Sequence, residues 1–455
     1  MTHHNNYSSS QFYLSAFARL AFARLAFVRL AFAAWLALSV HGVVQAQIND
    51  APVNTVVGPV VGHVSTESAV IWLRPIEEGH YTLALASSDS EFRRELTQFA
   101  DMDQDLCIHW HIYGLKPDTR YSYQIRYRDK QLASGDDCYF RTAPPDDRPA
   151  RVCLALGSCA WNEPNEIFRQ MGEEDANGIV LLGDTPYIDS GDLSFARYHH
   201  RNFLRIPQLA SVARSTSVWG TWDDHDYGDN DEDGNWPFKQ YNRQAFVEYR
   251  MNASYGEHGE GIYTKFRYGP IEVYLLDARW FSRTEPSPFD AEQHTLLGRQ
   301  QWQWLQRSLR SSTAPFKMLC TGMSWDSKRG PDADDWDSYP AEKNALFEFL
   351  GKNNISGVIL VGGDIHCQRH LKYDSTQQVG YPLHEFVVSP LHAKIAPVLN
   401  KPHPALVHSA AEPNVFLRVI ADSTVSPARL SVKYVQLAGH KMWEVELDET
   451  MLRRK

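Results

Sequence analysis

The segment Trp222-Asp223-Asp224-His225-Asp226-Tyr227-Gly228-Asp229-Asn230-Asp231 places five carboxylates, an imidazole and an amide within ten residues. An unpaired buried carboxylate costs more free energy than a fold can supply, so this segment cannot form a core. The apolar, β-rich run Ser217–Trp222 leads into this segment, so the acidic residues lie directly at the end of a predicted strand. Carboxylate, amide and imidazole groups are ligands of hard and borderline cations. We interpret the segment as the floor of a metal site; a solvated acidic loop is the alternative.

Length and charge narrow the class of protein. The chain has 455 residues and a formal net charge of −10. This length predicts two domains with additional segments. The negative charge argues against a nucleic-acid-binding surface, which needs clustered Lys and Arg. An acidic protein that handles anionic substrates needs bound cations.

The N-terminal residues 1–46 have the pattern of a signal peptide. Arg19, Arg24 and Arg29 precede the apolar run Leu30–Val44, and small residues follow as a cleavage site. Neither a twin-arginine pair nor a following Cys is present, which favours the general secretory route without lipidation. We therefore expect a periplasmic or secreted monomer with no stable membrane span after cleavage. An uncleaved N-terminal anchor is the alternative.

Residues 51–143 are predicted to form a small all-β sandwich, because short alternating runs are separated by Gly, Pro, Asp and Ser. The segment Leu115–Tyr121 has the form of a tyrosine corner, in which the Tyr hydroxyl ties a turn to the following strand. This module resembles a fibronectin-type-III-like domain. Its two cysteines, Cys107 and Cys138, fit either a disulfide or two core thiols.

A Pro-rich linker is predicted over residues 144–150, and an α/β layered domain over residues 151–455. Ligands of α/β sheets bind at the carboxyl ends of strands, so strands that end in reactive polar residues are expected to meet at one crevice. The β-rich segments after Arg369 are expected to form a second layer of sheet. Six predicted strands end in such residues: Val152–Leu156, Gly178–Leu182, Ser217–Trp222, Ile271–Leu276, Phe316–Cys320 and Val358–Val361.

Each polar residue at a strand end has a plain structural alternative. Cys159 fits a small buried residue, and Asp184 fits a turn or helix cap. Their joint placement carries the functional interpretation. A glycine before Asp184 and another before Asp364 let the backbone approach closely. Asp364 and His366 are expected to face the same side of an extended segment.

Five motifs occur in the order found in one enzyme family: Gly-Ser-Cys159, Gly-Asp184-x-x-Tyr187, Trp-Asp-Asp224-His225-Asp, Asp277-x-Arg279 and Gly-Gly-Asp364-Ile-His366-Cys. Together they resemble the PhoD-like alkaline phosphatases of the calcineurin-like metallophosphoesterase superfamily, over essentially all of 151–455. The resemblance implies a four-layer αββα sandwich preceded by the small β-sandwich. It also implies hydrolysis of phosphate mono- or diesters by metal-activated water.

The resemblance further implies a centre that contains Fe³⁺ and Ca²⁺. Thiolate, phenolate and imidazole suit a transition metal, whereas carboxylate oxygens suit calcium. The implied ligands are Cys159, Tyr187 and His366 for the iron, Asp224 and Asp364 for the calcium side, and Asp184 as a bridge between cations.

Two further residues are candidates for direct contact with the substrate. His225 is expected to hydrogen-bond the phosphoryl group or to protonate the leaving alkoxide. Arg279 is expected to hold a phosphate oxygen, with an ion pair to Asp277 as the structural alternative. Two other functions compete with the phosphoesterase: a mononuclear iron oxygenase, and a non-catalytic, calcium-stabilised extracellular binding protein.

Overall fold

The computed structural model describes residues 55–87, 92–173, 176–326 and 334–454, and the signal peptide predicted at 1–46 lies outside these ranges. Residues 54–455 form one compact unit. In the part of the chain that the model describes, no helix is both long enough and apolar enough to cross a membrane.

The first strands form two antiparallel sheets around a core of their own. Lys116 N–H donates to Tyr121 Oη at 2.9 Å, so the predicted tyrosine corner is confirmed. Cys107 and Cys138 are buried free thiols, not a disulfide. One sheet consists of β1 (Val57–Val64), β2 (Ser68–Arg74) and β5 (Ile108–Tyr113). The other consists of β4 (Arg93–Ala100), β3 (Gly79–Ser87), β6 (Arg120–Tyr127) and β7 (Lys130–Ala133), with β8 (Tyr139–Arg141) paired to β6.

The remaining strands form two large mixed sheets. The six-stranded sheet has the order β11 (Ser217–Thr221), β10 (Gly178–Leu182), β9 (Arg151–Gly157), β19 (Val415–Asp422), β20 (Arg429–Gln436) and β21 (His440–Asp448). The seven-stranded sheet has the order β12 (Thr264–Tyr268), β13 (Ile271–Leu275), β14 (Phe316–Cys320), β15 (Val358–Gly362), β17 (Leu383–Val388), β16 (Gln368–Tyr373) and β18 (Leu406–Ala410). The six strands with polar ends are all present, three in each sheet. Within each set of three, neighbours run parallel, so their carboxyl ends lie at one edge.

The expectation that the segments after Arg369 form a separate layer is wrong. Strand β19 pairs directly with β9, so that β19–β21 complete the six-stranded sheet. The register places Leu417 opposite Leu156 and Val419 opposite Leu154. Because β19 is buried along most of its length, its backbone N–H and C=O groups need partners on both edges, and β9 and β20 provide them.

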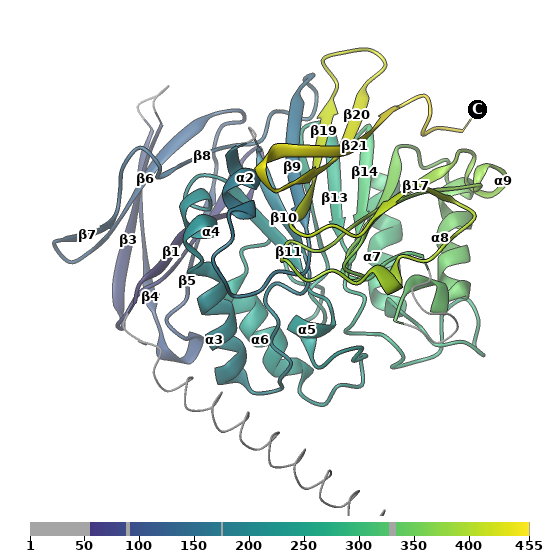
Figure 1. Cartoon of the computed structure of the whole chain (residues 1–455). Coiled ribbons are helices and arrows are strands. Elements are labelled where there is room, and N and C mark those ends of the chain that lie inside the picture. Colours follow the sequence, from purple (N-terminus) through teal and green to yellow (C-terminus); the bar gives the residue numbers. More distant parts are fainter. Residues whose placement is uncertain (1–54, 88–91, 174–175, 327–333, 455) are drawn as a thin grey trace, which may run out of the picture. The chain divides into compact units, whose positions relative to one another are not determined.

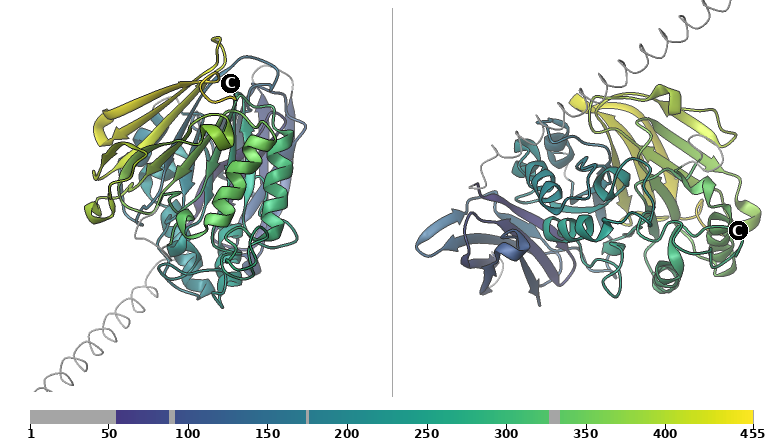
Figure 2. Two further views of the ribbon diagram at one scale, coloured as in Figure 1. Left: turned by 90° about the vertical axis from the view of Figure 1, so that its right-hand side faces the viewer. Right: turned by 90° about the horizontal axis from the view of Figure 1, so that it is seen from below.

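Helices cover both outer faces of the paired sheets (Figures 1 and 2). On the six-stranded side lie α2 (Ile167–Glu173), α3 (Leu193–Leu204), α4 (Pro207–Val212) and α6 (Lys239–Tyr249), and on the other side α7 (Gly298–Ser311) and α8 (Pro340–Lys352). Apolar side chains of both sheets share one core, as with Leu156 and Val361, and α7 adds Trp302 to it. The predicted four-layer αββα sandwich preceded by a small β-sandwich is confirmed.

The small β-sandwich is tied to the six-stranded side by backbone hydrogen bonds. Val61 N–H donates to Ala213 O, and His63 N–H donates to Met251 O, both at 2.7 Å. Trp72 of β2 is buried in the same apolar cluster as the helices α2 and α3. The domain boundaries at 51–143, 144–150 and 151–455 stay a prediction.

Candidate metal centre

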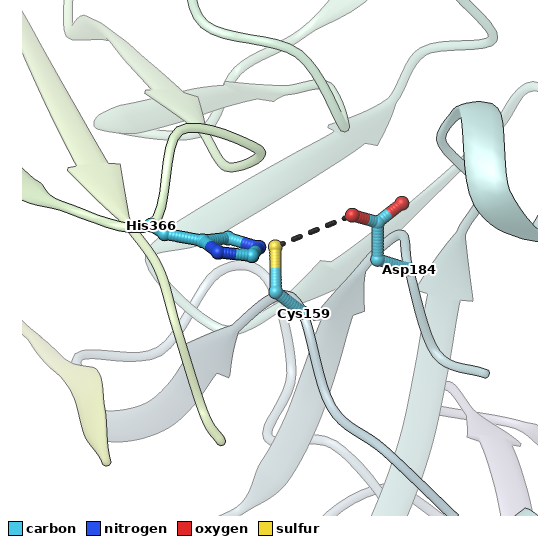
Figure 3. Close-up of side chains that lie close together, drawn as sticks. All are labelled: Cys159, Asp184 and His366. Carbon is cyan, nitrogen blue, oxygen red and sulfur yellow. Dashed lines mark hydrogen bonds between the residues drawn. The ribbon is translucent and has the colours of Figure 1, made fainter. Parts of the chain in front are cut away.

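The ends of β9, β10 and β15 bring three potential ligands together (Figure 3). One ligand atom from each of Cys159, Asp184 and His366 lies within 4.8 Å of the others. The Cys159 thiol donates to Asp184 Oδ2 at 3.4 Å. Cys159 and Asp184 are buried, whereas His366 is partly exposed. A sulfur, a carboxylate and an imidazole from three separate strand ends therefore face one point.

Asp184 also belongs to a second group of ligand atoms within 4.8 Å, together with Asp224 and His225 from the acidic segment. That segment leaves β11 and forms the short helix α5 (Asp224–Tyr227). A third group of the same kind joins Asp224 to Asp231 and Asp334. Each of Asp184 and Asp224 is thus shared by two groups, as a carboxylate that bridges two cations would be.

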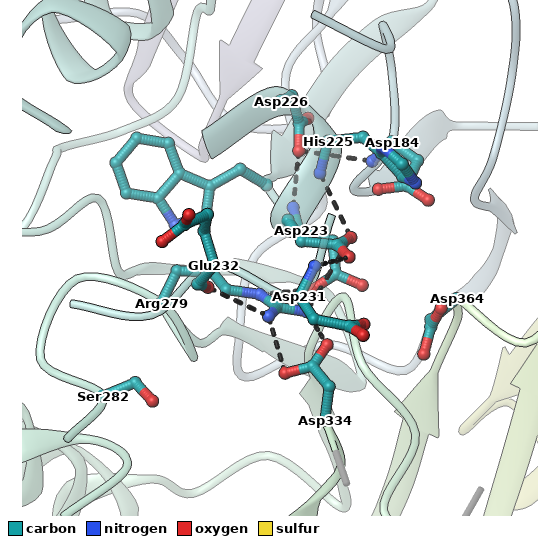
Figure 4. A network of polar contacts seen from close by, with 12 residues as sticks. Asp184, Asp223, His225, Asp226, Asp231, Glu232, Arg279, Ser282, Asp334 and Asp364 are labelled. Atoms are coloured by element: carbon teal, nitrogen blue, oxygen red, sulfur yellow. Dashed lines mark hydrogen bonds and ion pairs between the residues drawn. The ribbon is translucent and has the colours of Figure 1, made fainter. Parts of the chain in front are cut away.

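Tyr187 lies beside the first group. Its hydroxyl oxygen is 3.0 Å from His366 Nε2 and 3.3 Å from His392 Nε2. Asp364 contributes its backbone oxygen, which accepts from the Cys159 thiol at 3.6 Å. Among the described residues, the Asp364 carboxylate is in none of the three groups, and Figure 4 shows it at the side of the acidic network.

Four of the six predicted ligands have a left-handed backbone conformation. The φ angles are 58° at Cys159, 52° at Asp184, 69° at Asp364 and 50° at His366. Residues other than glycine adopt this conformation at a cost, and such residues cluster at functional sites. The expectation that Asp364 and His366 lie on an extended segment is wrong, because β15 ends at Gly362 and both residues have a positive φ.

Glycines allow the strand ends to approach each other, as predicted. Gly183 has a φ of 93°, and a Cβ there would lie 2.6 Å from the Asp223 Cβ. A Cβ at Gly363 would lie 2.4 Å from Ser158 Oγ. Both contacts are shorter than side chains tolerate, so the geometry requires glycine at each position.

Arg279 holds the acidic residues in place (Figure 4). Its guanidinium is 1% exposed. It donates to both Asp334 oxygens, at 2.7 and 2.6 Å, and to Asp223 Oδ1 through Nε at 2.8 Å. These side-chain bonds of Arg279 thus go to Asp223 and Asp334 and not to Asp277, the partner in the structural alternative. Asp277 instead accepts a hydrogen bond from the Arg279 backbone N–H at 3.0 Å. A contact of Arg279 with a phosphate oxygen stays a prediction.

Asp226 is a structural member of the acidic segment. Its carboxylate accepts hydrogen bonds from the backbone N–H groups of Asp184 and Thr185, at 3.3 and 3.4 Å. It also accepts from the N–H of Asp223 in a capping box of α5. Asp226 therefore links the end of β10 to the end of β11. It fixes the backbone from which the Asp184 and Asp223 carboxylates extend.

The electrostatics of the centre fit a bound cation. Burial, and then the charges of Asp224 and Asp223, raise the pKa of Asp184 well above its usual value. Burial and the charge of Asp184 likewise raise the pKa of the Cys159 thiol. Among the residues that the structure describes, the buried atoms Asp184 Oδ1 and Asp223 Oδ2 have no hydrogen-bond partner. A cation would satisfy Asp184 Oδ1 and offset the repulsion between these carboxylates.

His225 lies at the rim of the centre with one ring nitrogen occupied. Its Nδ1 makes a short hydrogen bond with Asp189 Oδ1. Burial disfavours the charged ring, but the bond to Asp189 and the charge of Asp224 outweigh it and raise the pKa of His225. The role of His225 toward a substrate stays a prediction. Asp231 lies within the acidic segment interpreted from the sequence as the floor of a metal site. Sequence reasoning assigned no role to Asp189, Asp334 or His392, because the fold is needed to show that they lie near the predicted ligands.

Solved structures with a similar fold identify the class of protein. A structure titled as that of PhoD aligns with a TM-score of 0.71 and 19% identity, over 88% of this chain and 91% of that chain. A purple acid phosphatase from yellow lupin (Lupinus luteus) seeds aligns with a TM-score of 0.64 and 13% identity, over 87% and 74%. The chain therefore has the fold of these two phosphatase structures.

Sequence comparison identifies the family. The model described as PhoD-like phosphatase matches residues 154–449. Alkaline phosphatase D of Bacillus subtilis (strain 168) is 24% identical over 389 residues, which cover 70% of this chain and 66% of that protein. The chain belongs to the PhoD-like phosphatase family, and its resemblance to that family is confirmed.

Proposed function

We propose that this protein is a metal-dependent phosphatase that hydrolyses phosphate esters. The observation that carries the proposal is the convergence of Cys159, Asp184 and His366 within 4.8 Å, with Asp184 shared by a second group. A non-catalytic calcium-binding protein has no need for a buried thiol beside these carboxylates, since calcium takes oxygen ligands.

We propose Fe³⁺ for the first group, with Cys159, Tyr187, His366 and Asp184 as its ligands, because thiolate, phenolate and imidazole suit a transition metal. We propose Ca²⁺ for the groups around Asp224. When bound, the cations supply Lewis-acid chemistry, in that they lower the pKa of a water and offset charge on phosphoryl oxygens.

In this proposal, His225 is the residue that donates a hydrogen bond or a proton to the substrate. Asp189 accepts the hydrogen bond from Nδ1 and so fixes the ring orientation. The other nitrogen is then directed to the phosphoryl group or to the leaving oxygen, and the raised pKa favours the proton-donating form. Arg279 does not contact the substrate; it orients Asp223 and Asp334 around the centre.

The test is hydrolysis of p-nitrophenyl phosphate and of its bis ester by the metal-replete protein. We expect Asp184→Asn to abolish turnover, and His225→Ala to lower kcat by about 10²–10⁴-fold. His80→Ala, at an exposed histidine of β3, is the matched control and should keep full activity. If both site variants stay fully active, the assigned site is wrong. If neither ester is hydrolysed, the binding-protein alternative is favoured. The ratio of rates on the two esters reports the mono- or diester preference.

We also propose export to the periplasm or medium as a monomer, on the charged and apolar pattern of residues 1–46. Sequencing the N-terminus of protein recovered from outside the cytoplasm tests the cleavage after Ala46. An intact N-terminus in that protein would support an uncleaved anchor.

A further inference from the structure

The segment that follows β17 lies against the end of β9, where Cys159 is found. Leu391 N–H donates to Ser158 O at 2.9 Å, and His392 N–H donates to Cys159 O at 3.1 Å. Ser158 Oγ donates to Val388 O at 2.8 Å. These bonds fix the segment 389–392 relative to the candidate metal centre. Side chains of this segment can therefore contact the predicted ligands.

Ser389 contacts two of those ligands at once. Its hydroxyl donates to Cys159 Sγ at 3.0 Å and accepts from the backbone N–H of His366 at 3.0 Å. Ser389 and Cys159 are completely buried. A hydroxyl that donates to sulfur stabilises the thiolate, which is the form that binds a metal. The same hydroxyl also fixes the backbone of His366, whose φ is positive.

His392 is oriented toward Tyr187 by a bond at its other nitrogen. The backbone N–H of Lys394 donates to His392 Nδ1 at 3.1 Å. Because Nδ1 accepts this bond, the proton of the neutral ring is on Nε2. Nε2 therefore donates to Tyr187 Oη, which is 3.3 Å away. A donor at this position stabilises a phenolate relative to a phenol.

Packing leaves the His392 ring little freedom. The ring stacks on Trp161 at 4.2 Å between centroids with an interplanar angle of 23°, and it meets the His366 ring edge-on at 4.7 Å. His392 is 3% exposed. Its direction is therefore set before any cation arrives.

We infer that Ser389 and His392 are positioning residues that hold the side chains of Cys159 and Tyr187 in place as ligands of the transition metal. This inference rests on the proposed function, because it assigns the two residues to ligands of the proposed iron. Hydrogen bonds to metal ligands fix ligand orientation, and their loss costs about 10–100-fold in metal affinity.

The experiment compares His392→Phe with His392→Gln in the full chain reconstituted with ferric iron and calcium ions. Phenylalanine keeps the stacking on Trp161 but removes the donor, whereas glutamine can place an amide N–H near Nε2. The control is His384→Phe, a buried histidine of β17 that bonds to His370 instead of the centre. The first readout is the visible phenolate-to-iron charge-transfer band. The second is the iron retained against a competing chelator, measured by elemental analysis.

We expect His392→Phe to shift the band to longer wavelength, since a phenolate without a donor is a better electron source, and to lose iron at about 10–100-fold lower chelator concentration. His392→Gln should restore both readouts, and His384→Phe should match the wild type. Ser389→Ala should lower iron retention in the same way.

Two results overturn the inference, and they differ in what else they overturn. If the wild type is active and contains iron, but His392→Phe has the same band and retention, the positioning role alone is wrong. If the wild type hydrolyses neither ester and retains no metal, the proposed function is wrong and the inference with it. A His392→Phe protein that fails to fold leaves His392→Gln and Ser389→Ala, whose retention of iron decides the question.

Discussion

Asp184 shows how a single residue combines the demands of this centre. It is shared by two groups of potential ligands, one of its oxygens has no hydrogen-bond partner within the described ranges, and its backbone is left-handed. Its identity as a candidate was predictable from the Gly-Asp-x-x-Tyr motif. Its bond with Cys159 was not, because the two residues come from different strands and only the parallel pairing of β9 and β10 aligns them.

Arg279 is the residue whose role changed most between sequence and structure. The motif indicated a phosphate contact, which stays a prediction; on its burial and its bonds to Asp223 and Asp334 we propose a supporting role instead. We predict that Arg279→Gln lowers the free energy of unfolding by about 3–5 kcal/mol, because it leaves buried carboxylates uncompensated. Urea unfolding of the two proteins measures this difference. A variant with unchanged stability and only a raised KM would show that Arg279 contacts the substrate instead.

At the scale of elements, buried apolar runs predicted strands well, and helix starts less well. The sequence from Ala291 to Arg310, with Trp302, Leu305 and Leu309 at helical spacing, predicts one helix, but α7 begins only at Gly298. The buried Glu342 of α8 explains the difference, since it accepts hydrogen bonds from Thr295 Oγ1 and from Leu297 N–H. Thr295 Oγ1 also accepts from the N–H of Gly298, the first residue of α7, at 2.8 Å. A contact between residues 47 positions apart has no local sequence signal.

Strand β17 contains a buried carboxyl that links stability to pH. Burial, and then the charge of Asp326, raise the pKa of Glu385 from 4.5 to about 7. The native state thus binds a proton that the unfolded state releases, so this stabilisation is complete below pH 4.5 and is lost as the pH rises through 7.

We predict that Glu385→Gln removes this dependence. The free energy of unfolding of the wild type should fall by about 3 kcal/mol relative to the variant between pH 4.5 and 8.5. Urea unfolding at the two pH values tests this expectation. Parallel changes in both proteins would show that Glu385 is ionised in the same way before and after folding.

At the scale of the whole molecule, the centre exists because two sheets place their carboxyl ends together. Cys159, Asp184 and Asp224 follow strands of the six-stranded sheet, whereas Asp364 and His366 follow β15 of the seven-stranded sheet. The sequence showed that each strand ends in polar residues. It did not show that β19–β21 join β9, because pairing between distant strands depends on tertiary contacts and not on local pattern.

A molecule built in this way should depend on its cations for stability. Removing them leaves buried like charges close together, so we predict that chelation lowers the thermal midpoint by several degrees and that added Fe³⁺ and Ca²⁺ restore it. Differential scanning calorimetry measures the midpoint. Asp184→Asn should respond much less, since it lacks the shared ligand. An identical response from this variant would place the stabilising cations elsewhere.

The central claim is that the strand ends hold a transition metal among Cys159, Asp184, Tyr187 and His366. The most direct measurement is an anomalous difference map from crystals of the active protein, collected on both sides of the iron absorption edge. We predict a strong peak among these four side chains that appears only above the edge. Metal peaks away from all four, in crystals of protein that hydrolyses phosphate esters, would contradict the account.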